Sequence, residues 1–199
     1  MPDQSGRPQL HVVVTSTRPG RVGLPVGQWF DAVAREHGGF AVRFVDLAEI
    51  DLPLVDEPNH PRLAQYTHAH TRAWSEIVSA ADAFAFVTPE YNYGFNAPFK
   101  NAVDYLFHEW AYKPAGFVSY GGVSGGLRGV QMAKQVLTTL KVMPITEAVS
   151  VPFVAQFIDD DGTFRPNDVI EASATAMLDE LLRWAGALAV LREPAAGAG

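Results

Sequence analysis

Short apolar runs alternate along this chain with longer segments in which apolar residues recur every three or four positions. The short runs are rich in β-branched and aromatic residues, which favour strands. The predicted strands occupy residues 10–15, 40–45, 83–88, 116–120 and 147–151. The run 83–88 is apolar up to its final threonine, which is typical of a strand buried on both faces.

The longer segments predict helices. Val26, Phe30 and Val33 share one helical face, and a pair of glycines follows them as a stop signal. Beyond this first helix, further helices are predicted at approximately residues 63–79, 98–110, 127–140 and 169–191.

Two segments do not fit either pattern. Residues 46–62 contain three prolines and predict a long irregular connection. Residues 157–164 are centred on Asp161-Gly162 and predict a small hairpin or tight turn.

The strand–helix alternation specifies a parallel sheet with right-handed crossovers and helices on both faces. Five such strands favour the order 2-1-3-4-5. The loops after the first, third and fourth strands then converge on one crevice, which is where open α/β sheets bind ligands. We expect residues 1–199 to form one α/β domain, with its core at about 9–191 and with frayed ends.

Charge and cysteine content narrow the classes of partner. The net charge is −7 and there is no long basic run, which argues against nucleic acid or an anionic membrane as a partner. The chain has no cysteine, which excludes disulfides, thiolate nucleophiles and cysteine-ligated metals. The first residues lack the hydrophobic stretch of a signal peptide, and no segment reaches the roughly 18 apolar residues of a membrane span. We therefore expect a cytoplasmic location.

The sequence predicts no metal site. His68 and His70 would lie about 200° apart on the predicted helix, so they could not share an ion. Residues 159–162 carry three consecutive carboxylates but lack the remainder of a calcium loop.

The loop after the first strand has the composition of a phosphate site. Ser16 and Thr17 supply hydroxyl groups, Arg18 supplies a guanidinium for bidentate binding, and the glycines at 20 and 23 allow close backbone approach. The alternative is a Pro-Gly turn with a solvated arginine. The loop does not match G-x-G-x-x-G, and no segment matches G-x-x-x-x-G-K-[ST], so a mononucleotide is favoured over a dinucleotide or a P-loop nucleotide.

Two further loops follow the third and fourth strands. Residues 89–94 read Pro-Glu-Tyr-Asn-Tyr-Gly, and residues 121–126 read Gly-Gly-Val-Ser-Gly-Gly. Tyr91 and Tyr93 are suited either to stacking on a flat heterocycle or to filling core. Glu90 is interpreted as a structural acceptor or a solvated carboxylate, not as a general base.

Together these motifs resemble the family of NADPH-dependent FMN reductases, which has a flavodoxin-like fold and includes quinone, azo and chromate reductases. The resemblance covers about residues 10–191, and its most specific part is the Pro-Glu-Tyr-Asn segment followed by Lys-Asn-Ala-Val-Asp at 100–104. It implies FMN as cofactor and NADPH or NADH as co-substrate.

The resemblance also implies which residues bind FMN. The phosphate would be held by Ser16, by Arg18 and by the amides near Arg21, Val22 and Gly23, with the Arg21 side chain facing either the phosphate or solvent. The isoalloxazine ring and ribityl chain would be bordered by Pro89, Glu90, Tyr91 and Asn92. The pyrimidine edge of the ring would be approached by Gly121 and Gly122.

The implied activity is an FMN-dependent NAD(P)H oxidoreductase. Hydride would pass from the nicotinamide to flavin N5 and then, in a ping-pong cycle, to a small-molecule acceptor such as a quinone, a free flavin or an azo compound. This step needs no acid or base, and no residue is predicted to be catalytic. The alternatives are a flavodoxin-like electron carrier or flavin-binding module without nicotinamide turnover, and a scaffold that has lost the cofactor. The modest charge and Arg18 favour the enzyme.

An apolar stripe on the predicted helix 98–110 is wider than one sheet face requires. We expect part of it, together with Tyr93 and Phe95, to pack against a second subunit beside the flavin, in a homodimer or homotetramer as is common in the family. The stripe comprises Phe99, Val103, Leu106, Phe107 and Trp110.

Overall fold

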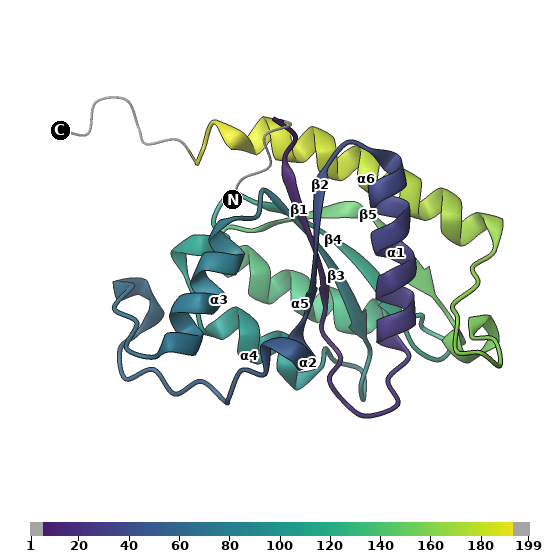
Figure 1. The fold of residues 1–199 in the computed structure, drawn as a ribbon, viewed down its shortest axis with the longest axis horizontal. Helices are drawn as coiled ribbons and strands as arrows, with labels where there is room; N and C mark the ends of the chain where they lie inside the picture. Colours follow the sequence, from purple (N-terminus) through teal and green to yellow (C-terminus); the bar gives the residue numbers. More distant parts are fainter. Residues whose placement is uncertain (1–5, 193–199) are drawn as a thin grey trace.

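The sheet has the predicted topology. The structure is a computed structural model that describes residues 6–192, so most of the termini expected to fray lie outside the described residues. Its five strands are all parallel and run in the order β2-β1-β3-β4-β5 (Figure 1). They are β1 (Gln9–Val14), β2 (Ala41–Asp46), β3 (Ala83–Pro89), β4 (Pro114–Tyr120) and β5 (Met143–Val151). Every residue of β3 and β4 is buried, as helices on both faces require.

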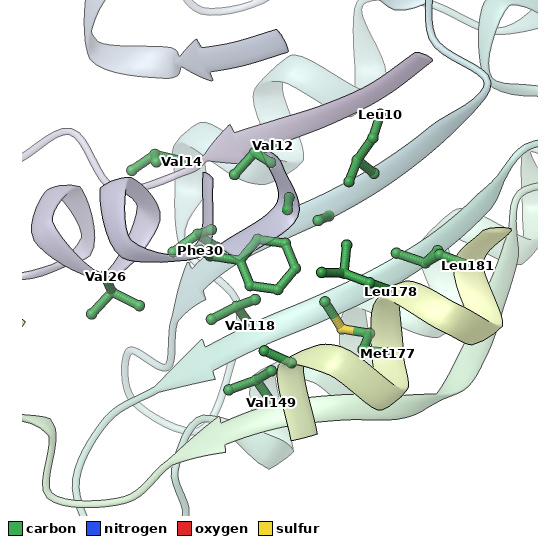
Figure 2. Close-up of a cluster of buried hydrophobic side chains, with 14 of the residues drawn as sticks. Leu10, Val12, Val14, Val26, Phe30, Val118, Val149, Met177, Leu178 and Leu181 are labelled. Carbon is green, nitrogen blue, oxygen red and sulfur yellow. The ribbon is translucent and has the colours of Figure 1, made fainter. Parts of the chain in front are cut away.

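One face of the sheet is covered by α1 (Gly23–His37) and α6 (Asp168–Ala189). Figure 2 shows the Phe30 ring of α1 lying between Val118 of β4 and Leu178 of α6. Phe30 and Leu178 are both fully buried, so this contact closes the core on that face.

The opposite face is covered by α3 (Ala69–Ser79), α4 (Ala97–Asp104) and α5 (Leu127–Thr139) (Figure 1). Trp74 of α3 and Trp110 lie edge to face at 6.1 Å between ring centroids. Their indole N–H groups donate to the carbonyls of Ala102 and Val103, respectively, at 2.8 and 3.1 Å. The Trp74 bond anchors α4 against α3, and the Trp110 bond holds Trp110 against the end of α4. The start of α4 lies at the carboxyl edge of the sheet.

Three element boundaries differ from prediction. The helix predicted from residue 63 begins at Ala69, because residues 61–63 form a separate 3-10 turn that stops at Ala64 with φ 49°. The helix predicted over 98–110 ends at Asp104, and a second 3-10 turn, His108–Trp110, returns Trp110 to the core. The last strand begins four residues early, at Met143, because an edge strand tolerates Pro144.

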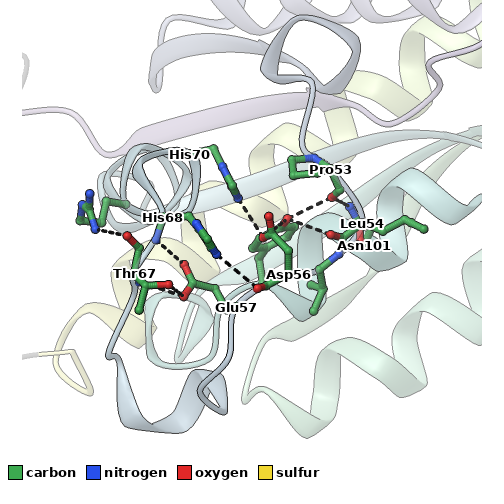
Figure 3. Close-up of polar contacts among 11 residues, drawn as sticks. Pro53, Leu54, Asp56, Glu57, Thr67, His68, His70 and Asn101 are labelled. Carbon is green, nitrogen blue, oxygen red and sulfur yellow. Dashed lines mark hydrogen bonds and ion pairs between the residues drawn. The ribbon is translucent and has the colours of Figure 1, made fainter.

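The expected irregular connection forms a strap, residues 51–68, that crosses the ends of α3 and α4 (Figure 3). Asn101 accepts a hydrogen bond from the Val55 amide and donates one to the Pro53 carbonyl. Tyr105 donates to the Pro53 carbonyl and also contacts the Asp56 carboxylate. Short helix α2 (Leu47–Ile50) precedes the strap. The predicted turn near residue 162 is present, with an isolated bridge between Ile158 and Phe164.

The geometry predicted for the histidine pair is wrong. His68 lies before the helix, so the His68 and His70 rings stack in parallel with centroids 5.1 Å apart. His70 pairs with Asp56 at 3.0 Å. Among residues 6–192, no group of three or more histidines and carboxylates is arranged to hold a metal ion. Within the same range, no helix has the length and apolar character needed to cross a membrane.

Candidate functional site

The first and second candidate loops are joined by a buried polar network. The Thr15 hydroxyl, at the end of β1, lies 3.0 Å from the Thr88 hydroxyl and 3.1 Å from the Asn96 side-chain oxygen. The Asn96 amide group donates to the Thr15 carbonyl at 2.6 Å. All three residues are at most 1% exposed. The two loops therefore leave the sheet side by side. Polar residues at the ends of buried strands are the one sequence signal that could have predicted this network.

The second and third loops are joined by Glu90. Its carboxylate accepts hydrogen bonds from the Arg128 amide at 3.0 Å, the Gly129 amide at 3.4 Å and Arg128 Nε at 2.7 Å. A carboxylate in this position caps the amino terminus of α5. Burial would by itself raise the pKa of Glu90, but the Arg128 guanidinium, Ser124 and the two amides outweigh it and lower the pKa below the usual value. Glu90 is thus a structural acceptor, one of the two roles considered for it.

The two tyrosines lie on a tight turn at the rim. Tyr91 and Gly94 exchange two backbone hydrogen bonds of 2.9 Å, and the residues between them, Asn92 and Tyr93, have φ values of 50° and 72°. Two successive positive φ values correspond to a type I′ turn, which is strained for tyrosine. Tyr91 is 39% and Tyr93 68% exposed, so neither fills the core. The Arg128 guanidinium lies 3.6 Å from the Tyr93 ring centre and holds this turn against α5.

The first loop ends in an uncapped helix terminus. No side chain caps α1, its first turn holds no acidic residue, and Val22 occupies the cap position. Ser16 is 1% exposed, and its hydroxyl oxygen has no hydrogen-bond partner. Free amides and the helix dipole make such a terminus an anion site. Arg18 lies exposed on the same loop and forms no ion pair among the described residues.

Because Gly23 has no side chain, the Tyr120 and Ser16 hydroxyl groups pack closely against this terminus. A Cβ placed on Gly23 would lie 2.2 Å from Tyr120 Oη and 2.3 Å from Ser16 Oγ, so any other residue would displace one of these side chains. The Tyr120 side chain therefore reaches from the end of β4 to the first loop. Tyr120 is 4% exposed, and its burial raises the pKa of its phenol. Sequence reasoning missed Tyr120, because nothing in the pattern of β4 indicates where its last side chain points.

The Arg21 side chain faces neither of the two environments expected for it. Its guanidinium forms a bidentate pair with Asp46 at the end of β2, with Nη1 and Oδ1 2.6 Å apart, and it also donates to the Ser16 carbonyl. The hydrogen bond to Asp46 raises the pKa of Arg21 further above its usual range. This pair fixes the first loop to β2 and leaves the Arg21 amide beside the start of α1.

The third loop lies against the second. The Glu90 amide donates to the Tyr120 carbonyl at 3.1 Å, and a Cβ on Gly121 would lie 3.8 Å from Glu90 Cβ. Gly122 is exposed, with open space where its side chain would be. Pro89 pairs in register with Tyr120 at the ends of β3 and β4. All of the sequence-predicted site residues thus lie in three adjacent loops at one edge of the sheet.

Comparisons with known proteins identify the family. The sequence model of the NADPH-dependent FMN reductase family matches residues 8–156, and this chain belongs to that family. An NAD(P)H-dependent FMN reductase of Schizosaccharomyces pombe is 39% identical over 149 residues, covering 73% of this chain and 74% of the relative. A quinone reductase of Pseudomonas putida is 29% identical over 184 residues, covering 87% of this chain and 92% of the relative.

Solved structures show the same fold. FerB, a flavoenzyme NAD(P)H:(acceptor) oxidoreductase from Paracoccus denitrificans, is similar with a TM-score of 0.69 and 21% identity, over 90% of this chain and 98% of that chain. The sheet order and this likeness confirm the predicted flavodoxin-like fold. By family membership the protein is an oxidoreductase that uses FMN with NAD(P)H as co-substrate.

Gly23→Ala, with Gly186→Ala as its control, tests the packing of Tyr120 and Ser16 against Gly23 at the start of α1. Gly23→Ala forces Tyr120 or Ser16 to move, and we expect a loss of about 1–3 kcal/mol in the free energy of unfolding together with weaker FMN binding. Gly186→Ala, on the exposed face of α6 with open space at its Cβ, should stabilise the protein by about 1 kcal/mol and leave FMN binding unchanged. Urea unfolding and FMN fluorescence titration measure both effects. If Gly23→Ala bound FMN as tightly as the wild type, the start of α1 would not be part of the FMN site.

Proposed function

We propose that the three loops bind FMN at the carboxyl edge of the sheet. Ser16, Arg18 and the amides of Arg21, Val22 and Gly23 hold its phosphate. The observation that carries this proposal is the buried, unpartnered Ser16 hydroxyl beside an uncapped helix terminus, where Gly23 allows Ser16 to pack closely. A terminal phosphate supplies acceptors for all of these donors at once.

The remaining loops border the ring system. Pro89, Glu90, Tyr91 and Asn92 flank the isoalloxazine and ribityl chain. Gly121 and Gly122 approach the pyrimidine edge. The pair with Asp46 orients the first loop, so that Arg21 contributes its amide while Arg18 contributes the guanidinium.

Bound FMN supplies the hydride chemistry between NAD(P)H and an acceptor. The chain itself positions the flavin in loops that are already fixed. Backbone donors near the pyrimidine edge stabilise negative charge on the ring. No side chain is assigned as an acid or base. Nicotinamide and acceptor occupy the same slot in succession, which gives ping-pong turnover. The names of the relatives, which include quinone reductases, support a quinone among the acceptors, beside free flavins and azo compounds.

A reduction experiment tests this function. Purified protein should be yellow and release FMN on heating, and anaerobic mixing with NADPH should bleach the flavin absorbance, which an added quinone then restores. Flavin that stays oxidised in NADPH would indicate an electron carrier instead. A colourless protein that does not take up FMN would refute the cofactor assignment altogether.

Arg18→Ala tests the phosphate site. Losing a charged hydrogen bond should weaken FMN binding by about 1.5–3 kcal/mol, which is roughly a ten- to hundredfold rise in Kd. Arg183→Ala, an exposed arginine on α6 that pairs with Glu180, is the matched control and should leave the Kd unchanged. Equal Kd values for the wild type and Arg18→Ala would mean that the phosphate binds elsewhere.

We also infer a homodimer or homotetramer in the cytoplasm. Phe99, Val103, Leu106 and Trp110 are each 1% exposed, so these four stripe residues belong to the chain's own core. Half-buried Phe107 and the rim residues around Tyr93 are left for a second subunit. Sedimentation velocity at micromolar concentration should give a dimer or tetramer, and a clean monomer would contradict this inference.

A further inference from the structure

Two buried hydroxyl groups meet beside the start of α1. The Ser16 hydroxyl belongs to the first loop, and the Tyr120 phenol reaches it from the end of β4. Both oxygens would lie within 2.3 Å of a Cβ on Gly23, so the two side chains come together at this glycine. Ser16 is 1% and Tyr120 4% exposed, yet Ser16 Oγ has no hydrogen-bond partner. A buried hydroxyl without a partner is costly, so we expect a bound ligand to complete this pair.

The Tyr120 phenol is held in place from both sides of the sheet. Its residue pairs in register with Pro89 of β3 and Val151 of β5, and its carbonyl accepts a hydrogen bond from the Glu90 amide at 3.1 Å. The side chain belongs to the core cluster that α1 and α6 cover. A phenylalanine would make the same apolar contacts, so packing alone does not require the hydroxyl group.

The surroundings of Tyr120 make it a hydrogen-bond donor. Burial is the largest influence on its phenol and raises the pKa, so the phenol is protonated at neutral pH. The Ser16 hydroxyl and the charges of Arg21 and Arg18 act in the opposite direction without reversing the rise. These three groups belong to the first loop, so the phenol lies close to the proposed phosphate site. A phenol is more acidic than an alkyl hydroxyl, which makes Tyr120 the stronger donor of the pair.

We propose that Tyr120 is a positioning residue for the phosphate of FMN, and that it acts through Ser16. The phenol donates its hydrogen to Ser16 Oγ, and the Ser16 hydroxyl then donates its own hydrogen to a phosphate oxygen. This order satisfies both hydroxyl groups, and the bond that Ser16 accepts strengthens the bond that it donates. The proposal rests on the proposed function, which puts the phosphate at the start of α1. It makes Tyr120 a determinant of selectivity for FMN over riboflavin, which has no phosphate.

Flavin titrations of Tyr120→Phe test this role. The variant keeps the ring and loses only the hydroxyl, so the Kd for FMN should rise roughly three- to tenfold while the Kd for riboflavin stays at the wild-type value. Its resistance to urea without flavin should also stay unchanged. Tyr112→Phe is the matched control: this tyrosine lies just before the opposite end of β4, where its hydroxyl accepts a hydrogen bond from Lys141, and its loss should change neither Kd.

A double-mutant cycle with Ser16→Ala tests whether Tyr120 acts through Ser16. In the Ser16→Ala background the phenol has no hydroxyl oxygen to donate to, so adding Tyr120→Phe should cause no further loss of FMN affinity. Losses that add in full would mean that the phenol acts independently of Ser16, which overturns the proposal.

The remaining outcomes separate this inference from the function on which it rests. An equal rise in Kd for FMN and riboflavin would show that Tyr120 only supports the loops, and an unchanged Kd for FMN would show that its hydroxyl has no part in binding. Either result overturns the role of Tyr120 while the wild type still binds FMN, so the FMN site stands. A wild type that binds no FMN would instead refute the proposed function itself.

Discussion

Helices cover the carboxyl ends of the parallel strands, so the polar groups buried there need hydrogen-bond partners. In this protein the partners come from the neighbouring loops. Thr15, Thr88 and Asn96 form one buried network across β1, β3 and the start of α4. Leaving any one of these groups without a partner would cost about 1–3 kcal/mol. The network therefore determines where the first two loops leave the sheet, and with them the position of the proposed phosphate site.

Glu90 joins the second loop to the third in the same way, through hydrogen bonds of its side chain. Its carboxylate caps α5 and pairs with Arg128, whose guanidinium in turn stacks on Tyr93. This chain of contacts holds a strained turn in place, so an exposed tyrosine has a fixed position at the rim. A ligand bound there meets loops that are already ordered, which reduces the entropy lost on binding.

Charge is distributed in a way that suits anionic ligands. The protein is acidic overall, yet Arg18 lies exposed on the carboxyl-edge loop and forms no ion pair within residues 6–192, while Arg21 is paired with Asp46. Arg18 is thus available for the phosphate of the proposed site, and Arg21 serves the structure.

The alternation of apolar runs and helical patterns determined the architecture, because each strand and helix is specified by neighbours close in sequence. The three loops and the composition of residues 16–23 follow from such local signals. The strand order follows from the number of alternating strand–helix units. Contacts between residues far apart in the chain could not be predicted in this way. The pairing of Arg21 with Asp46, the reach of Tyr120 to Gly23 and the meeting of Arg62 with Phe107 depend on side-chain directions that only packing decides. The same holds for the start of α3, where a left-handed residue and the strap contacts override a helical pattern that continues through them.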